Sequence, residues 1–345
     1  MYKIKASPGR TVTIDEKDYL YFSGTAYLGI PKDPDFLALV IEGFRRYGTN
    51  FGGSRLANVR FDIFDKTEAT LLSLTGAPAA ISASSGTMAG QLLAHYFFGK
   101  ADMLATPDAH PAMLPPGNTA QRLETNWKEN ILEIISSSKA PLVLFSNAVN
   151  VLNVEKTDFS WVKEVPEDKP FTLVVDDSHF LGIGGKAGGG TYSILEKPDH
   201  VELIVLSSLG KAFGLPTGVI LGSVSLIESL WETPLFGGAS PTVLAYLYAF
   251  VEGQPVYEKN RAQLEKNIAW FSSRLVSKER FKTFDGFPVF SVADENLADD
   301  LFEKGILLSA FNYPTPTSPL VTRIVINSLH RTGDLDKLLE HLNIN

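Results

Sequence analysis

The sequence predicts an α/β fold, with a large domain built on a mostly parallel central sheet and a smaller α+β domain after it. Three observations support this prediction. Short apolar runs in the first two thirds of the chain are continuous rather than alternating, which is typical of parallel strands covered on both faces. Segments of helical period separate these runs, which indicates βαβ units with right-handed crossovers. Near residue 236 the pattern changes to longer helical segments followed by short strands.

These elements divide the chain into three parts. Residues 1–42 hold two strand-like runs, at 12–14 and 19–22, and we expect this segment to pack on the small domain. The large domain spans residues 43–235, and the small domain spans residues 236–345. In the large domain we expect strands at 79–83, 101–106, 142–145, 171–175, 203–207 and 219–221, and helices at 61–74 and 87–98. In the small domain we expect helices at 242–251, 258–276, 296–304 and 333–342, and strands at 287–292 and 322–327.

The composition excludes several classes of function. None of the 345 residues is a cysteine, which rules out disulfides, thiolate metal sites and thiol nucleophiles. A formal net charge of −8 argues against a nucleic-acid partner. The apolar runs are much shorter than the roughly 20 residues of a membrane span, and no apolar stretch follows the N-terminal lysines. We therefore expect a cytoplasmic protein that binds neither membranes nor nucleic acid.

A lysine follows the expected strand at 203–207, in the stretch Ser208-Leu209-Gly210-Lys211-Ala212. A phosphate-binding P-loop would need glycine at Val205 and a hydroxyl residue at Ala212, so that interpretation fails. Desolvation among small and apolar residues lowers the pKa of a lysine and frees its amine to form a Schiff base. A lysine whose amine simply reaches solvent is the alternative at this point.

Two carboxylates end another apolar strand, in Asp176-Asp177-Ser178-His179. Neighbouring side chains of a strand point to opposite faces, so one of the two acids faces a given ligand. Such a carboxylate needs a cationic partner, which a protonated pyridine nitrogen would supply. His179 is then placed to hydrogen-bond a phenolic oxygen of the same ring. Two solvated acids and a structural histidine are the equal alternative.

A glycine-rich stretch, residues 182–190, follows these acids. Gly182, Gly184 and Ala187 formally match the dinucleotide-binding pattern of a nicotinamide oxidoreductase. However, the glycines do not follow a strand directly, and further glycines interrupt the helix that the pattern requires. We favour a flexible loop over a site.

An anion cradle is predicted at Ser85-Gly86-Thr87, where a strand gives way to a helix. Backbone N–H groups and the helix dipole attract a phosphate there, although plain N-capping is the slightly favoured explanation for this stretch taken alone. Ala83 stands where the nucleophile elbow of a serine hydrolase needs glycine, which excludes that class. His110 follows another strand end, where an imidazole can stack on a planar ring. Arg323 lies in an apolar strand, so it either grips a substrate carboxylate or forms an internal salt bridge.

Taken together, these motifs resemble the α-oxoamine synthase family. The resemblance runs from residue 18 to the end of the chain and is clearest in four motifs. These are Gly52-Gly53-Ser54-Arg55-Leu56, the stretches 176–179 and 208–214, and His330-Arg331-Thr332-Gly333-Asp334 with the residues after it. The family consists of pyridoxal 5′-phosphate (PLP) enzymes of fold type I, the aspartate-aminotransferase fold. The resemblance therefore implies a PLP-dependent transferase that condenses an amino acid with an acyl-CoA or another acyl thioester, and the 8-amino-7-oxononanoate synthase branch, in biotin biosynthesis, is the first expectation.

The resemblance also implies roles for individual residues. Lys211 corresponds to the Schiff-base lysine, which also shuttles the proton. Asp176 corresponds to the partner of the pyridinium nitrogen, and His179 to the partner of the ring oxygen. The remaining positions are His110 stacked on the ring, Ser85, Gly86 and Thr87 with Ser208 at the phosphate, and Arg323 at the substrate carboxylate. The family is homodimeric, so Ser240 is expected to reach the cofactor phosphate of the partner subunit, and no metal is implied.

The sequence departs from the family pattern in several places. The family's helix before the matching region has no counterpart here, and a family histidine falls on Phe64. The strand that reads Glu-Gly-x-Phe-Ser-Met-Asp-Gly-Asp in the family is replaced by residues 147–155, so a family serine beside the cofactor has no clear counterpart. Transamination and aldol-type cleavage are therefore alternatives to acyl transfer. A PLP-binding scaffold or regulatory subunit with altered catalysis is the alternative from another class.

Overall fold

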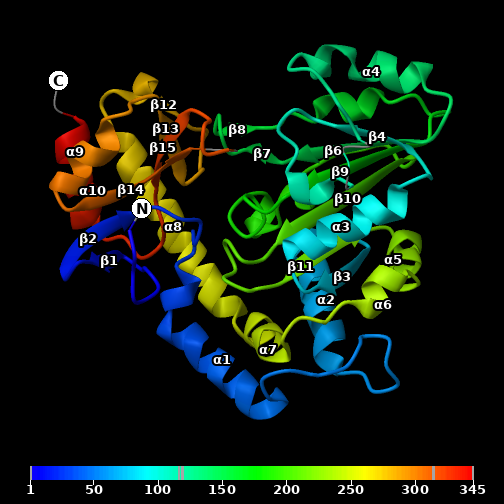
Figure 1. Ribbon diagram of the computed structural model, residues 1–345, viewed down its shortest axis with the longest axis horizontal. Helices are drawn as coiled ribbons and strands as arrows, with labels where there is room; N and C mark the ends of the chain where they lie inside the picture. The colour runs from blue at the N-terminus through cyan, green and yellow to red at the C-terminus, as the bar shows by residue number, and fades with distance from the viewer. Residues whose placement is uncertain (1, 116, 118–119, 313–314, 344–345) are drawn as a thin grey trace.

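A computed structural model of the chain describes residues 2–115, 117, 120–312 and 315–343, and it contains two main sheets (Figure 1). The larger sheet has seven strands in the order β3-β11-β10-β9-β6-β4-β5. Strands β4, β6, β9 and β10 run parallel to their neighbours in this group, and β11 is antiparallel to both β10 and β3. The predicted mostly parallel sheet is therefore confirmed. Its strands are β3 (Ala79–Ala83), β4 (Asp102–Ala105), β5 (Gln121–Arg122), β6 (Leu142–Asn147), β9 (Phe171–Asp176), β10 (Val201–Ser208) and β11 (Gly218–Gly222).

Both faces of this sheet are buried, which is why its strands are continuously apolar in sequence. On β9, Leu173 and Val175 belong to one hydrophobic core, and Val174 between them belongs to the other. The side chains of β10 alternate between the two cores in the same way. The helices that follow or flank these strands are α2 (Asp62–Thr75), α3 (Gly86–Phe97), α4 (Trp127–Ser137), α5 (Val224–Trp231), α6 (Pro234–Gly238) and α7 (Leu244–Glu252). Because Asp176 continues the side of Val174, it lies on the face covered by α3.

The second sheet has the order β1-β2-β14-β15-β13-β12. Strand β2 pairs with β14 in parallel, so the N-terminal segment forms part of the same sheet as the C-terminal strands, as Figure 1 shows. The strands are β1 (Thr11–Ile14), β2 (Lys17–Phe22), β12 (Phe281–Lys282), β13 (Val289–Val292), β14 (Ile306–Asn312) and β15 (Leu320–Val325). The helices of this part are α8 (Gln254–Arg274), α9 (Leu297–Glu303) and α10 (Thr332–Leu342). The domain boundaries themselves stay a prediction.

Helix α1 (Pro34–Tyr47) was not expected from the sequence, and it runs across the predicted boundary at residue 42. Asp33 caps it by accepting hydrogen bonds from the backbone N–H groups of Asp35 and Phe36, and Pro34 occupies its first position. Both are helix-start signals. The helix packs against α7. A small hairpin, β7 (Val149–Asn150) and β8 (Glu155–Lys156), was also missed. Within the described ranges no helix combines the length and the apolar character needed to cross a bilayer.

Candidate active site

The predicted site residues converge at the C-terminal ends of the parallel strands, where open α/β sheets bind ligands. Asp176 ends β9, and Lys211 follows β10 three residues beyond Ser208. The charges of Lys211, Arg323 and His110 all act on His179, and that of Asp176 acts on Lys211. Residues that lie far apart in the sequence are thus electrostatic neighbours.

The two adjacent acids at the end of β9 have different surroundings. Asp177 is fully buried and accepts hydrogen bonds from the hydroxyl (2.7 Å) and the backbone N–H (2.9 Å) of Thr191. Burial raises the pKa of Asp177 to about 7. Asp176 is half-buried, and its Oδ1 accepts a hydrogen bond from the backbone N–H of Ser178. The two acids therefore differ in burial and in partners, and the role of Asp176 in the site stays a prediction.

The lysine lies on a loop that folds back on itself. Leu209 donates its backbone N–H to the carbonyl of Thr217 and accepts one from Leu215, which closes the loop around Lys211. Burial lowers the pKa of Lys211, and the negative charge of Asp176 partly opposes this shift. The amine is therefore easier to deprotonate than that of an exposed lysine.

Two histidines belong to this group, and the charges of Lys211 and His110 both act on His179. Nδ1 of His179 lies 2.8 Å from the hydroxyl of Tyr27, and burial lowers the pKa of His179 well below its ordinary value, helped by the charge of Lys211. His110 is exposed, and its Nδ1 accepts a hydrogen bond from the backbone N–H of Ala112. Asn147 holds the loop before it by donating to the carbonyl of Asp108 and accepting the backbone N–H of His110.

The predicted anion cradle lies beside the end of β10. Ser85 caps α3 by accepting the backbone N–H of Met88, as the capping alternative required. Ser85 and Thr87 remain exposed. A Cβ added to Gly86 would lie 2.6 Å from Cβ of Ser208, so only glycine lets the turn approach that serine so closely. The first turn of α3 and Ser208 therefore lie very close together.

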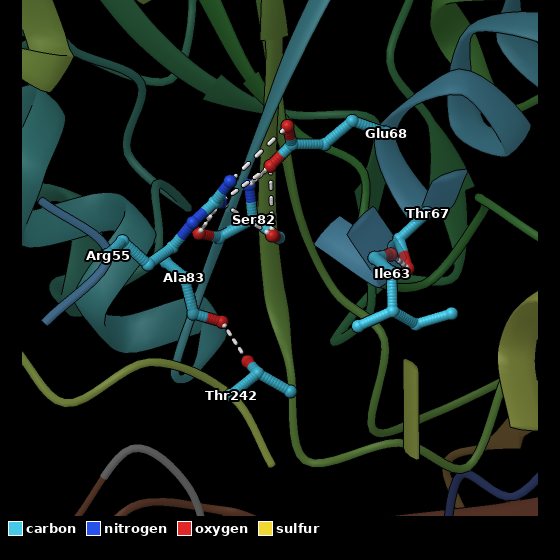
Figure 2. Close-up of polar contacts among 7 residues, drawn as sticks. All are labelled: Arg55, Ile63, Thr67, Glu68, Ser82, Ala83 and Thr242. Carbon is cyan, nitrogen blue, oxygen red and sulfur yellow. Dashed lines mark hydrogen bonds and ion pairs between the residues drawn. The ribbon is translucent and has the colours of Figure 1, made fainter. Parts of the chain in front are cut away.

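A buried polar network fixes the strand that leads into this turn (Figure 2). Nη1 of Arg55 lies 2.6 Å from Oε1 of Glu68, and the same oxygen accepts hydrogen bonds from the backbone N–H (2.9 Å) and hydroxyl (3.0 Å) of Ser82. Thr242 donates its hydroxyl to the carbonyl of Ala83. Arg55 belongs to a motif that was recognised in the sequence, whereas no role was predicted for Glu68 or Thr242. Glu68 could have been recognised from the sequence because it is a charged residue on the otherwise apolar side of a helix.

The remaining predicted residues lie at the edge of this group. Nη1 of Arg323, on β15, donates to the carbonyl oxygen of Val151 at 2.9 Å, and its guanidinium lies 5.0 Å from the ring centre of Phe311. This hydrogen bond ties β15 to the segment that departs from the family pattern. Ser240 lies exposed between α6 and α7, and its expected role concerns a second subunit.

The glycine-rich stretch forms a closed loop against β9. Gly182 donates to the carbonyl of Gly188, and Gly190 donates to that of Gly184. A Cβ on Gly190 would lie 1.9 Å from Oδ2 of Asp177, so the glycine lets the loop reach that buried acid. The next elements are single 3₁₀ turns at Lys186–Gly188 and Thr191–Ser193. The dinucleotide pattern therefore lacks the α-helix that it needs.

Comparisons with known proteins show the family and the fold of the chain. The family model for aminotransferase class I and II matches residues 152–342, more than half of the chain. The 8-amino-7-oxononanoate synthase of Buchnera aphidicola is 26% identical, over 98% of this chain and 92% of its own length. A structure of SPT, a serine palmitoyltransferase, with PLP has a TM-score of 0.84 at 17% identity and covers 99% of this chain and 91% of its own. The 8-amino-7-oxononanoate synthase of Francisella tularensis has a TM-score of 0.72 at 24% identity and covers 94% and 96%.

Proposed function

The chain belongs to the aminotransferase class I and II family, and on this premise we propose that it is a PLP-dependent acyltransferase of the α-oxoamine synthase type. Its fold is that of PLP fold type I, as the sequence resemblance implied. The proposed reaction condenses an amino acid with an acyl-CoA, releases CoA and the carboxylate of the amino acid as CO2, and forms an amino ketone. The names of the curated relatives support this reaction type.

The observation that carries the proposal is the environment of Lys211. Burial lowers the pKa of its amine, and the negative charge of Asp176, at the end of the neighbouring strand, opposes this shift. A buried amine that is readily deprotonated is what a lysine needs to bond covalently to an aldehyde. A carboxylate beside it suits a cationic ring nitrogen.

The donor set fits PLP. Backbone N–H groups at the start of α3, together with Ser208, suit its phosphate, and Gly86 provides the close backbone approach. Asp176 suits the ring nitrogen, and His179 suits the phenolic oxygen. His110 suits a ring face, and Lys211 suits the aldehyde. Each polar group of the cofactor thus has a residue of matching chemistry among those that converge here.

When bound, PLP supplies an electron sink for a carbanion at Cα of the amino acid. The residues of this chain do the rest. Lys211 takes a proton from Cα and returns it, which its lowered pKa favours. Asp176 keeps a proton on the ring nitrogen through its negative charge. Arg323 binds the substrate carboxylate and so orients the amino acid, which aligns the bond at Cα that is to be broken.

The substrates that we favour are alanine and a pimeloyl thioester, which makes biotin precursor synthesis the first assignment. Relatives called 8-amino-7-oxononanoate synthase that align over nearly the whole chain support it. Transamination is the second candidate, because the matching family model describes aminotransferases and residues 147–155 differ from the synthase pattern. We further propose a cytoplasmic location, which suits a chain without cysteine.

We propose that the active form is a homodimer. Large apolar side chains are exposed on α1 (Leu37, 54%, and Ile41, 44%) and on the segment before α2 (Leu56, 45%, and Val59, 58%). A second copy of the chain would cover this surface. In that assembly Ser240 contributes to the cofactor phosphate of the partner subunit, as the resemblance implied.

The test begins with PLP uptake. Purified protein is incubated with PLP, reduced with borohydride and digested, and mass spectrometry locates the label. We expect the label on Lys211 and its loss in Lys211→Ala, while Lys186→Ala, which removes a nearby exposed lysine, keeps it. Absence of uptake, or a label on another lysine, would overturn the proposal.

The reaction is tested next. The loaded enzyme is screened for CoA release with amino acids and acyl-CoAs, alanine with pimeloyl-CoA first. CoA release that depends on the amino acid supports the synthase. Amino-group transfer to an oxo acid without CoA release would favour the second candidate, and PLP uptake with neither reaction would favour a scaffold.

A further inference from the structure

The segment that follows β2 contributes a buried tyrosine to this group of residues. Tyr27 follows β2 and is 1% exposed, and its hydroxyl lies 2.8 Å from Nδ1 of His179, 152 positions away in the sequence. The sequence analysis assigned no function to this tyrosine. Its position couples the N-terminal segment to the histidine on which the charge of Lys211 acts.

The segment that carries Tyr27 is held firmly. The carbonyl of Tyr27 accepts the backbone N–H of Ser328, and Gly29 donates its backbone N–H to Ala26. Gly29 has φ +62°, and a Cβ there would lie 2.5 Å from Cγ of Leu329. The tyrosine ring also contacts Phe287 in a tilted pair with 6.3 Å between ring centres. The hydroxyl of Tyr27 therefore has little freedom to reorient.

The protonation states decide the direction of the hydrogen bond. Burial raises the pKa of Tyr27 further above its ordinary value, so the hydroxyl keeps its proton. A buried hydroxyl must donate that proton, and in the described part of the chain Nδ1 of His179 is the acceptor within reach. His179 is neutral because its pKa is lowered, so its ring carries one proton, and that proton is then on Nε2.

We propose that Tyr27 is a positioning residue, which holds His179 in the tautomer protonated on Nε2 so that this nitrogen donates to an anionic oxygen of the bound ring. The inference rests on the proposed function for the identity of that ring. With the opposite tautomer, a lone pair on Nε2 would face the anionic oxygen and repel it. Tyr27 thus acts through His179 and has no need to touch the cofactor.

The tautomer can be measured without PLP. In ¹⁵N spectra of protein labelled at histidine, an unprotonated ring nitrogen resonates far downfield of a protonated one. His179→Gln identifies the signals of His179 by their loss. We expect Nδ1 to be the unprotonated nitrogen in the wild-type chain and its signal to move toward the protonated position in Tyr27→Phe. Unchanged signals in Tyr27→Phe would overturn the inference.

Tyr257→Phe is the matched control. Tyr257 is also buried, and its hydroxyl donates to the carbonyl of Phe213 at 3.1 Å, so the substitution again removes one buried hydroxyl. It should leave the nitrogen signals of His179 where they are. If both substitutions moved them equally, the effect would come from general loosening, and the positioning role would be rejected.

A binding cycle tests the second half of the inference. Tyr27→Phe should raise the dissociation constant for PLP about fivefold, the effect of one neutral hydrogen bond. In a His179→Gln background the same substitution should change nothing further, because Tyr27 acts through that histidine. Additive effects would overturn the inference. If the wild-type chain bound no PLP, the proposed function would fail, while the tautomer result would stand by itself.

Discussion

Arg55 and Glu68 form a buried ion pair with 2.6 Å between Nη1 and Oε1, and this pair supports the strand that leads into the anion cradle. Their side chains are 5% and 14% exposed. The guanidinium also lies over the rings of Phe64 and Trp231 at 4.1 and 4.7 Å from their centres. The pair therefore links α2, the Gly-Gly-Ser-Arg motif and β3.

Removing one partner of this pair should destabilise the protein strongly. Glu68→Ala leaves a buried guanidinium and two polar groups of Ser82 without their partner, which should cost about 3 kcal/mol in the free energy of unfolding. Urea titration followed by circular dichroism measures the change. Lys66→Ala breaks an exposed ion pair with Asp62 on the same helix and should leave stability nearly unchanged. Equal losses in the two variants would contradict the buried role.

Asp177 should make stability fall as pH rises. Its folded pKa, about 7, lies above its unfolded value of roughly 4. The native state therefore binds more protons between these values, and the stabilising contribution of this group is complete below about pH 4 and lost as pH rises through about 7. Asp177→Asn removes this titration. The difference in free energy of unfolding between wild type and variant, measured from pH 4 to 8, should decrease as pH rises. A difference that does not change with pH would refute the raised pKa.

His330 should show the opposite dependence. Burial lowers its pKa to about 4, its Nδ1 accepts the backbone N–H of Asn327, and its Nε2 donates to the carbonyl of Tyr21. The contribution of the neutral ring is complete above about pH 6.5 and is lost as pH falls toward 4. The difference in free energy of unfolding between wild type and His330→Gln should therefore decrease as the solution is acidified.

Gly86→Ala should impair the anion cradle. The added methyl would lie 2.6 Å from Cβ and 3.0 Å from Cα of Ser208, which forces the turn and β10 apart. We expect a loss of about 1–3 kcal/mol in stability and at least tenfold weaker PLP binding by fluorescence titration. Gly333→Ala places the same methyl where no atom lies within 4 Å and should leave both quantities nearly unchanged. PLP affinity equal to wild type in Gly86→Ala would show that phosphate does not bind at this turn.

Arg323 should control substrate affinity more than PLP affinity. If its guanidinium binds the substrate carboxylate, Arg323→Ala should lower kcat/KM for the amino acid about 100-fold, the effect of losing a charged hydrogen-bond partner. Steady-state kinetics and PLP titration separate the two effects. Arg280→Ala, which removes an arginine paired with Asp294 at the surface, serves as control. Loss of stability with unchanged kinetics would mean that the contact with Val151 is the main role of Arg323.

Local signals in the sequence account for most of the large sheet. The run at 79–83 coincides with β3, and the acids after β9 divide between two faces as alternation requires. Helix α1 was missed although Asp33 and Pro34 mark its start and its apolar residues recur at helical spacing. The link between Tyr27 and His179 joins the segments that follow β2 and β9, and neither local periodicity nor motif spacing carries such information.

The parallel pairing of β2 with β14 has a consequence for folding. It places Leu20 opposite Ile306, so the β1–β2 hairpin has no neighbour on the β14 side of β2 until the ribosome has made nearly all of the chain. Contacts between such distant positions form slowly, because a long loop must close first. Until then the edge of β2 is open to pairing with other chains, and a nascent or truncated form that ends before β14 should aggregate or require a chaperone.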